Sequence, residues 1–192
     1  MRPLVFHDAV AGTAFFASYG GWCLWELVLQ RRAKAPERTD RSRWWLFVTT
    51  TLGASLIFPA SGVGLRLPAG PRWAPVAAGV GLIIAGWALR RWSVRTLGRW
   101  FTVTVTVEPD QRVVDTGPYR LLRHPSYTGM LVSLLGMGVG LDSWASVAVA
   151  VGFPLIGIVR RIDEEEGMLV RELGAPYREY SRRTRRLVPG VW

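Results

Sequence analysis

Five long apolar segments, separated by polar ones, constrain the fold of this chain more than any other feature. They cover residues 9–30, 44–66, 73–89, 127–141 and 144–159. A helix needs about 20 apolar residues to cross the hydrocarbon core of a bilayer. The last two segments are shorter, so they either barely span the bilayer or pack inside the bundle. The pattern predicts an all-α, polytopic transmembrane helical bundle with about five spans.

Positive charge alternates between the segments that join these apolar runs. Residues 31–43 carry six basic and two acidic side chains, whereas residues 67–72 carry a single Arg. Residues 90–126 and 160–186 are again rich in Arg, and the turn at 142–143 has no positive charge. Short loops rich in Lys and Arg stay on the cytoplasmic side. We therefore expect an outside N-terminus, a C-terminal cytoplasmic helical segment, and a multi-pass cell-membrane protein whose active site faces the cytoplasm.

The charge and the residue types exclude several kinds of partner. The 192 residues include 24 basic and 14 acidic side chains, which give a formal net charge of +10. The Arg residues flank apolar segments, so we expect contacts with anionic membrane lipids and not with nucleic acid. The single cysteine, Cys23, and two distant histidines, His7 and His124, offer no metal-ligating cluster, so no metal is expected. Nothing in the sequence indicates an obligate protein partner.

Polar residues are concentrated in two segments, 104–127 before the last pair of apolar runs and 160–180 after it. The turn-like pair at 142–143 joins these runs as the tip of a helical hairpin. A hairpin brings its two ends together, so the strings GPYRLLRHPSY and RRIDEEEGMLVRELGAPYREY should be neighbours in space. The four consecutive acids from Asp163 to Glu166 repel one another and anionic lipid. We expect nearby Arg side chains or a cationic ligand to compensate them.

Local signals predict where the helices of this half of the chain begin and end. Pro125 suits the first turn of a helix. Gly174, with Pro176 just beyond, is a usual helix stop. A second short helix is expected over about 176–186.

Two further features concern helix packing and charge inside the apolar runs. Small residues at helical spacing, Gly136 with Gly140 and Ala148 with Gly152, predict close contacts between helices. Glu26 lies near the end of the first run, one turn from the basic loop. It is interpreted either as a functional carboxylate or as a side chain that snorkels to the interface.

Two motifs at a fixed separation point to a known family. The string RHPSYTG at 123–129 and the string EEGML at 165–169 lie on either side of the predicted hairpin. They resemble the RHPxYxG and Glu-Glu-x-x-Leu signatures of the isoprenylcysteine carboxyl methyltransferase family. The lead-in GPY at 117–119 and the tail LGAPYREY at 173–180 also match. The resemblance covers about residues 105–190, whereas the first 90 residues match only in being apolar spans.

The resemblance implies an integral membrane enzyme that uses S-adenosylmethionine to methylate a lipid-like or small lipophilic acceptor. It divides the chain into a three-span membrane region at 1–92 and a catalytic region at 93–192. Arg161 matches an arginine placed near the substrate, and the family's cofactor pocket maps onto Gln111, Val113, Val114, Tyr119, His124, Pro125, Ser126, Tyr127, Glu165 and Glu166. Gln111 replaces a His of the eukaryotic enzymes, which leaves its role open.

The chemistry of these side chains leaves the acceptor open. A carboxylate such as Glu165 suits the positively charged cofactor. An acceptor carboxylate needs no base and could be fixed by Arg161. An amine or thiol must lose a proton, with help from a carboxylate or His124, so Arg161 and His124 are the candidate catalytic residues.

Other functions fit parts of the sequence. Phospholipid and small-thiol methyltransferases share the signature. NADPH-dependent membrane reductases share RHP-x-Tyr-x-Gly but usually have Asn and Glu where this chain has Ser126 and Met130. A non-enzymatic membrane scaffold explains the spans but not the two motifs.

Overall fold

The computed structural model describes residues 3–31, 41–68, 70–102, 107 and 110–190. Over these residues the fold is all-helical, as predicted, and contains no strand beyond one isolated bridge between Leu122 and Arg185. Six α-helices follow one another along the chain: α1 (Ala9–Arg31), α2 (Arg41–Ala60), α3 (Ala74–Leu97), α4 (Pro125–Gly140), α5 (Trp144–Leu173) and α6 (Ala175–Arg183). Short 3₁₀ turns occupy Leu4–Phe6, Ser61–Val63, Gly98–Trp100 and Gly117–Arg120.

The five apolar segments correspond to α1 to α5, but two of these helices run further than predicted. α3 continues past residue 89 to Leu97, because no helix breaker occurs before Gly98. α5 joins the apolar run 144–159 to the polar segment that follows it in one helix of 30 residues. Among the described residues, two helices are long and apolar enough to cross a membrane, Trp44–Val63 and Trp144–Leu173. Most of the predicted basic loop, residues 32–40, lies outside the described residues.

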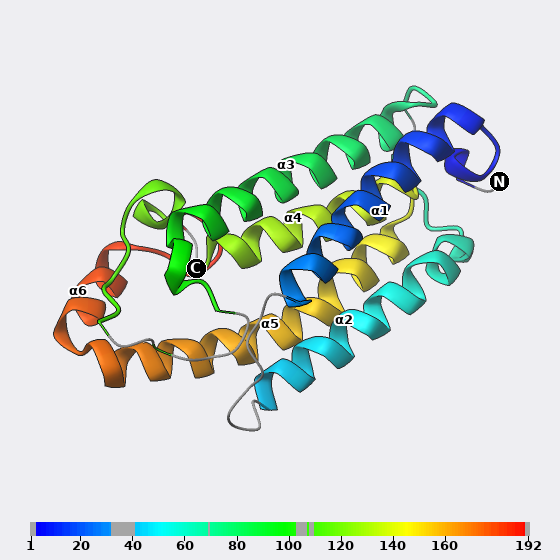
Figure 1. Ribbon diagram of the computed structural model, residues 1–192. Coiled ribbons are helices and arrows are strands. Elements are labelled where there is room, and N and C mark those ends of the chain that lie inside the picture. The colour runs from blue at the N-terminus through cyan, green and yellow to red at the C-terminus, as the bar shows by residue number, and fades with distance from the viewer. Residues whose placement is uncertain (1–2, 32–40, 69, 103–106, 108–109, 191–192) are drawn as a thin grey trace.

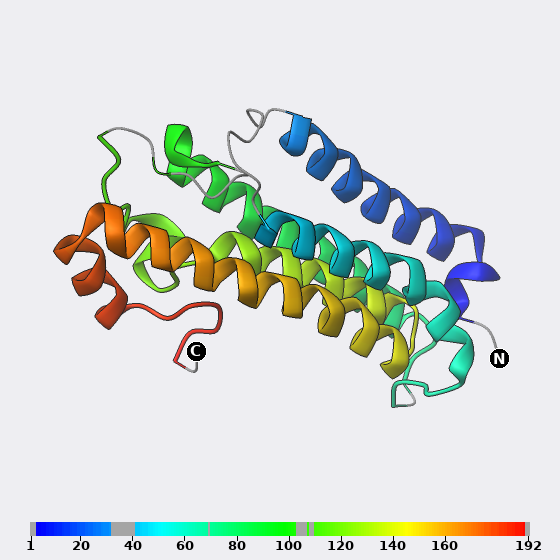
Figure 2. The same cartoon turned by 90° about the horizontal axis from the view of Figure 1, so that it is seen from below.

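The helices form an elongated bundle, in which α3 packs along α4 and α2 packs along α5 (Figure 1). The antiparallel pair of α4 and α5 joins these two halves. α1 runs along one edge, packed mainly on α3, and is well separated from α5 in the view from below (Figure 2). The helix α6 folds back at the end of α5, beside the start of α4.

Glycines bring α3 and α4 into close contact. A Cβ atom at Gly79 would lie 2.5 Å from the Cα of Gly140, and one at Gly136 would lie 2.6 Å from the Gly79 carbonyl oxygen. No larger residue fits these positions without moving a backbone. The predicted contact at Gly136 and Gly140 is confirmed.

The companion prediction for Ala148 and Gly152 is wrong. Both residues are exposed, and a Cβ atom at Gly152 would meet no atom within 4 Å. α5 instead approaches α2 at Gly157, where a Cβ atom would lie 2.8 Å from the Cα of Leu46. The reason is rotational, because Gly157 lies on the helix face turned toward α2 and Gly152 lies on the outer face.

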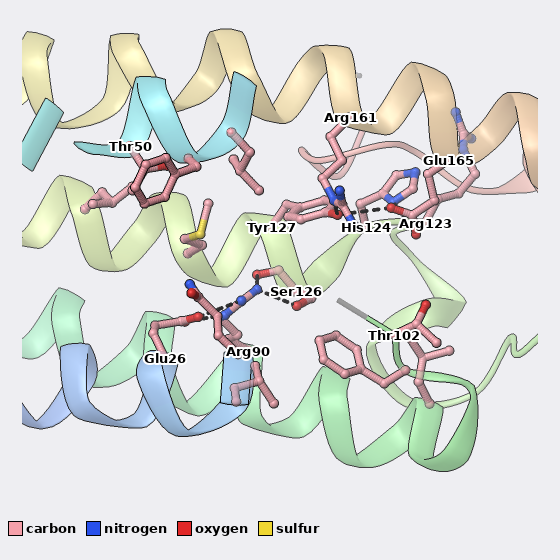
Figure 3. Close-up of a pocket in the computed structure, with 18 of the residues that line it drawn as sticks. Glu26, Thr50, Arg90, Thr102, Arg123, His124, Ser126, Tyr127, Arg161 and Glu165 are labelled. Atoms are coloured by element: carbon pink, nitrogen blue, oxygen red, sulfur yellow. Dashed lines mark hydrogen bonds and ion pairs between the residues drawn. The ribbon is translucent and has the colours of Figure 1, made fainter. Parts of the chain in front are cut away.

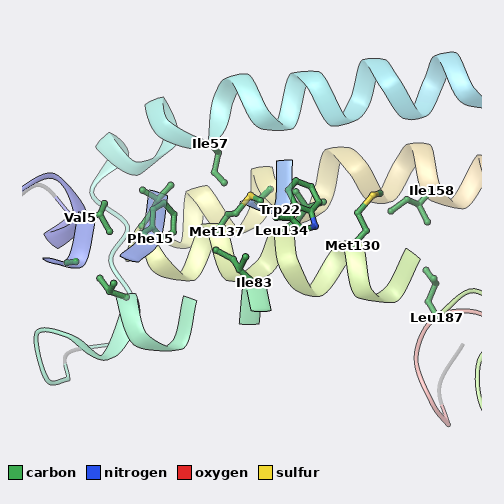
Figure 4. Close-up of a cluster of buried hydrophobic side chains, with 14 of the residues drawn as sticks. Val5, Phe15, Trp22, Ile57, Ile83, Met130, Leu134, Met137, Ile158 and Leu187 are labelled. Carbon is green, nitrogen blue, oxygen red and sulfur yellow. The ribbon is translucent and has the colours of Figure 1, made fainter. Parts of the chain in front are cut away.

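The buried core follows α4, whose side chains Met130, Leu134 and Met137 recur at helical spacing (Figure 4). Phe15 of α1 and Ile158 of α5 pack against the same cluster. The outer faces of the helices carry large apolar side chains that remain exposed: Leu24, Leu52, Leu56, Ile84, Trp92, Trp144 and Ile156. An apolar outer surface of this extent needs a nonaqueous neighbour.

The helix ends match their local signals with one correction. Pro125 opens α4, and Gly174 ends α5 in the left-handed region with a φ of 64°. The last helix was predicted over 176–186 but ends at Arg183. Beyond it, the backbone of Thr184 to Leu187 bonds to the α4 entry segment, which competes with further helix formation.

Candidate functional site

A cavity of about 1070 Å³ extends through the bundle. Its lining comes from all six α-helices and from the chain that leads into α4. Tyr127, Arg161 and Glu165 lie together at one end, which is polar, whereas Thr50 lies toward the other end (Figure 3). The lining away from the polar end includes apolar side chains such as Met130 and Leu134. The volume is at the upper end of the roughly 300–1000 Å³ usual for ligand sites. It leaves room for more than one small ligand.

The polar end is organised by a chain of hydrogen bonds across the hairpin. The Nε of Arg161 donates to the Tyr127 hydroxyl at 2.7 Å, and this hydroxyl donates to Glu165 Oε2 at 3.1 Å. The imidazole of His124 stacks on the Tyr127 ring, with 5.8 Å between the ring centroids. Arg161 is almost fully buried, while a third of the Glu165 side chain remains exposed. Of the two motif glutamates, Glu165 is therefore the one that a ligand in the cavity can reach.

Glu166 has a different environment from its neighbour. Its Oε1 accepts from Arg123 Nε at 2.6 Å and lies 3.1 Å from His124 Nε2, while its Oε2 accepts from Arg186 Nη2 at 2.8 Å. Arg186 also pairs with Asp163 at 3.0 Å. Arg side chains therefore compensate two members of the acidic run, Asp163 and Glu166, as expected. Glu166 is not part of the cavity wall.

The tautomer of His124 follows from these contacts. A carboxylate only accepts hydrogen bonds, so the short contact to Glu166 requires a proton on His124 Nε2. In the neutral ring, Nδ1 is then the unprotonated nitrogen, and it lies 3.9 Å from Glu165 Oε1. His124 therefore presents its basic nitrogen toward the side of Glu165.

The residues Thr184 to Leu187, here called the C-terminal strap, hold the entry of α4 in place. The backbone N–H groups of Arg123 and His124 donate to the carbonyls of Arg185 and Arg186 at 2.7 and 3.1 Å. The Thr128 hydroxyl donates to the Leu187 carbonyl at 2.7 Å. The strap could not be predicted from the sequence, because most of these bonds use backbone atoms.

Two tyrosines support the same corner. The Tyr180 hydroxyl, on α6, donates to the carbonyls of Tyr119 and Leu122 at 2.8 and 3.2 Å. Burial raises the pKa of Tyr180, so its hydroxyl remains a donor at neutral pH. The pKa of Tyr119, which lines the cavity, is also raised, mainly by burial and to a smaller degree by the nearby Glu165 carboxylate. α6 therefore fixes the loop that carries Tyr119.

The residues predicted from the motifs are brought together in space, and all but two of them line the cavity. Pro125 is fully buried in the first turn of α4, and Glu166 faces the arginine cluster. The remaining predicted residues all line the cavity: Gln111, Val113, Val114, Tyr119, His124, Ser126, Tyr127, Arg161 and Glu165.

A second polar centre lines the cavity and was not predicted. Glu26 of α1 forms a two-point ion pair with Arg90 of α3, whose guanidinium also bonds to Ser126 (Figure 3). The snorkelling interpretation of Glu26 is therefore wrong, because its carboxylate points inward. The periodicity of α3 could have identified Arg90, which continues the buried face formed by Val76, Gly79, Ile83 and Gly86.

Comparison with known proteins agrees with the motifs. Residues 79–171 match the model of the Isoprenylcysteine carboxyl methyltransferase (ICMT) family. Protein-S-isoprenylcysteine O-methyltransferases A and B of Arabidopsis thaliana are 36% and 35% identical over 118 residues, 59% of this chain and 58% of each plant protein. The cobalt-zinc-cadmium resistance protein CzcN of Cupriavidus metallidurans is 31% identical over 154 residues, 76% of this chain and 62% of that protein. The match thus spans about three fifths of each relative's length.

Proposed function

We propose, from the match of residues 79–171 to the isoprenylcysteine carboxyl methyltransferase family model, that this chain is an S-adenosylmethionine-dependent methyltransferase of a membrane. Its acceptor would be a lipophilic molecule such as an isoprenylated cysteine. The observation that carries the proposal is a single cavity with an acidic, aromatic end and an apolar end. One such cavity can hold a charged cofactor and an apolar acceptor in contact.

The polar end of the cavity fits the cofactor in charge and shape. S-adenosylmethionine supplies a methyl group on a positively charged sulfur, beside an ammonium, and has an adenine ring. Glu165 offers a partly exposed carboxylate to positive charge, and Tyr119 and Tyr127 offer aromatic walls. The chain at Gln111 to Val114 lines the same end with backbone groups that can bond a purine edge.

Methyl transfer asks little covalent help from the protein. The acceptor atom must lie close to the methyl group, in line with the bond that breaks, and water must be excluded. Arg161 lines the cavity with its Nε held by the Tyr127 hydroxyl, so its planar fork is oriented to fix an acceptor carboxylate. If the acceptor is an amine or thiol, His124 Nδ1 or Glu165 would take its proton.

The apolar end of the cavity supports a lipophilic acceptor. Side chains from α1, α2 and α4, including Leu27, Phe47 and Met130, line it. α1 and α2 also carry exposed apolar side chains. Transfer of an alkyl or prenyl chain from water into this end would contribute about 0.8 kcal/mol for each methylene group, whereas a chain that enters from the bilayer gains little, because lipid tails are already apolar. A phospholipid or a long-chain thiol would gain the same energy, so the tail alone does not define the headgroup.

The membrane arrangement is part of the proposal. We place α1 to α5 as five spans with the polar end of the cavity at the cytoplasmic surface, because the described Arg side chains gather there and positive loops stay in the cytoplasm. The region 1–92 would shape the apolar end, and the region 93–192 would carry the cofactor and the chemistry.

Binding and transfer measurements on the detergent-purified protein test this function. We expect calorimetry to detect S-adenosylmethionine and not NADPH. We then expect transfer of a labelled methyl group to N-acetyl-S-farnesylcysteine, measured beside phosphatidylethanolamine and a long-chain alkyl thiol. Binding of NADPH without S-adenosylmethionine would instead support a reductase. Methylation of the phospholipid or the thiol alone would reassign the acceptor within the same reaction class.

A further inference from the structure

The ion pair between Glu26 and Arg90 is buried in the wall of the cavity. Arg90 Nη2 donates to Glu26 Oε2 at 2.8 Å, and Arg90 Nε donates to Glu26 Oε1. Only 10% of the Arg90 side chain and 12% of the Glu26 side chain are exposed. A two-point contact of this kind fixes the relative orientation of the two side chains. It therefore fixes the end of α1 relative to α3.

Arg90 extends this connection to the start of α4. Its Nη1 donates to the Ser126 hydroxyl at 2.7 Å and to the Ser126 carbonyl at 3.2 Å. The contact depends on Gly129, because a Cβ atom there would lie 2.7 Å from the Arg90 backbone nitrogen. The last glycine of RHPSYTG thus allows α3 to approach α4 closely enough for this bond. One guanidinium joins three helices.

α1 needs such a connection because its last half faces the cavity. Near its first half, Phe16 stacks on Phe58 of α2 with 6.2 Å between ring centroids, and Phe15 packs on Gly140. Near its last half, Cys23, Glu26 and Leu27 line the cavity from one side. α2 lines the cavity from another side with residues such as Thr50 (Figure 3).

We infer that the Glu26–Arg90 pair positions the acceptor side of the cavity, by holding α1 as one wall and joining that wall to Ser126 at the start of α4. Glu26 and Arg90 are positioning residues that act through α1 and Ser126. The part of this inference that concerns acceptor affinity rests on the proposed methyltransferase function. The part that concerns the position of α1 does not.

The burial of both charged groups explains why loss of one partner is costly. Removal of the Glu26 carboxylate leaves a buried guanidinium without its counter-charge, which is far more costly than loss of a surface pair. The structure can lower this cost by moving α1 and admitting water to Arg90. We therefore expect Glu26→Gln to loosen the last half of α1 while the first half stays on Phe58.

Cys23 is a natural reporter of this movement, because it lies on α1 one turn before Glu26 and is the only cysteine of the chain. We expect N-ethylmaleimide to label Cys23 about tenfold faster in Glu26→Gln than in the unmodified protein, since local opening controls access to partly buried groups. The matched control is Arg91→Gln, an exposed arginine beside Arg90. Equal labelling rates in all three proteins would overturn the inference, whether or not the protein is a methyltransferase.

Kinetics with N-acetyl-S-farnesylcysteine then separate the two ends of the connection. We expect Glu26→Gln to raise the acceptor KM about tenfold with less than a threefold change in the affinity for S-adenosylhomocysteine. Ser126→Ala should change cofactor affinity more than acceptor KM. The charge exchange of Glu26→Arg with Arg90→Glu should restore slow labelling of Cys23. If Glu26→Gln does not fold, Glu26→Asp replaces it, and an unchanged KM together with unchanged labelling in that variant would also overturn the inference.

Discussion

Glu165 and Glu166 are neighbours on α5, yet they belong to two regions with opposite properties. The Glu166 carboxylate is enclosed by other side chains, because Arg123, His124 and Arg186 all contact it. Glu165 faces the cavity, where it accepts a hydrogen bond from the Tyr127 hydroxyl and a third of its side chain is exposed. A rotation of about 100° between successive helical residues is enough to produce this difference.

The difference teaches that the two glutamates of one motif have separate tasks. The Glu166 region holds α5, the entry of α4 and the C-terminal strap together. The Glu165 region keeps a carboxylate available to a ligand. His124 belongs to both regions, because its Nε2 faces Glu166 and its Nδ1 faces Glu165. Substitution at each position therefore should alter a different measured property.

The largest expected effect is on stability, from Glu166→Ala. This change leaves Arg123 and Arg186 without their shared counter-charge, which for a buried pair costs about 3–5 kcal/mol. Thermal unfolding in detergent should show a large loss, and hydrogen exchange should show faster opening of the strap. Glu172→Ala, at an exposed position on the same helix, is the control. Similar losses in both variants would contradict the separation of tasks.

The next effect is on ligand affinity, from Glu165→Ala. Loss of a charged hydrogen bond to the cofactor should cost about 1.5–3 kcal/mol, or roughly tenfold to a hundredfold in Kd. Unfolding should change much less than in Glu166→Ala, because Glu165 is partly exposed. Calorimetry with S-adenosylmethionine measures the effect, and Glu164→Ala at the exposed preceding position is the control. An unchanged Kd would remove Glu165 from the cofactor site.

The smallest of the three effects is expected from Arg161→Lys, and it is an effect on turnover. Lysine keeps the positive charge but loses the planar fork, so we expect turnover to fall about tenfold while cofactor affinity changes less than threefold. Single-turnover transfer of a labelled methyl group gives the rate, and calorimetry gives the affinity. Arg160→Lys, on the exposed side of α5, is the control. An equal loss of rate and affinity would place Arg161 at the cofactor and not at the acceptor.

Much of this fold could be predicted from local sequence. The apolar runs gave α1 to α5, and Pro125 and Gly174 fixed two helix ends because their backbone preferences need no distant partner. The approach of α4 entry and α5 exit followed from the hairpin alone. The extra length of α3 was missed because its last turns are charged, although charged residues such as Arg95 are good helix formers.

Only part of the candidate site, likewise, could be predicted from the sequence. The residues of the RHP and double-glutamate motifs could be placed together, because both motifs flank one hairpin. Neither Glu26 with Arg90 nor Arg123 with Arg185 could be paired from sequence, since the first pair depends on helix rotation and the second on a backbone carbonyl. The different fates of Glu165 and Glu166 depend on rotation as well. Pattern alone does not contain that information.

The C-terminal strap has a consequence for the order in which the protein is assembled. Arg123 bonds to the Thr184 carbonyl, 61 residues further along the chain. At about 5–20 residues per second, synthesis of that stretch takes roughly 3–12 s. α4, at residues 125–140, is synthesised early in this interval, while the carbonyls that fix its entry do not yet exist. The contacts between the strap and the entry of α4 are thus completed late in biogenesis. Strap variants should therefore lower the yield of assembled protein more readily than they alter the rate of catalysis.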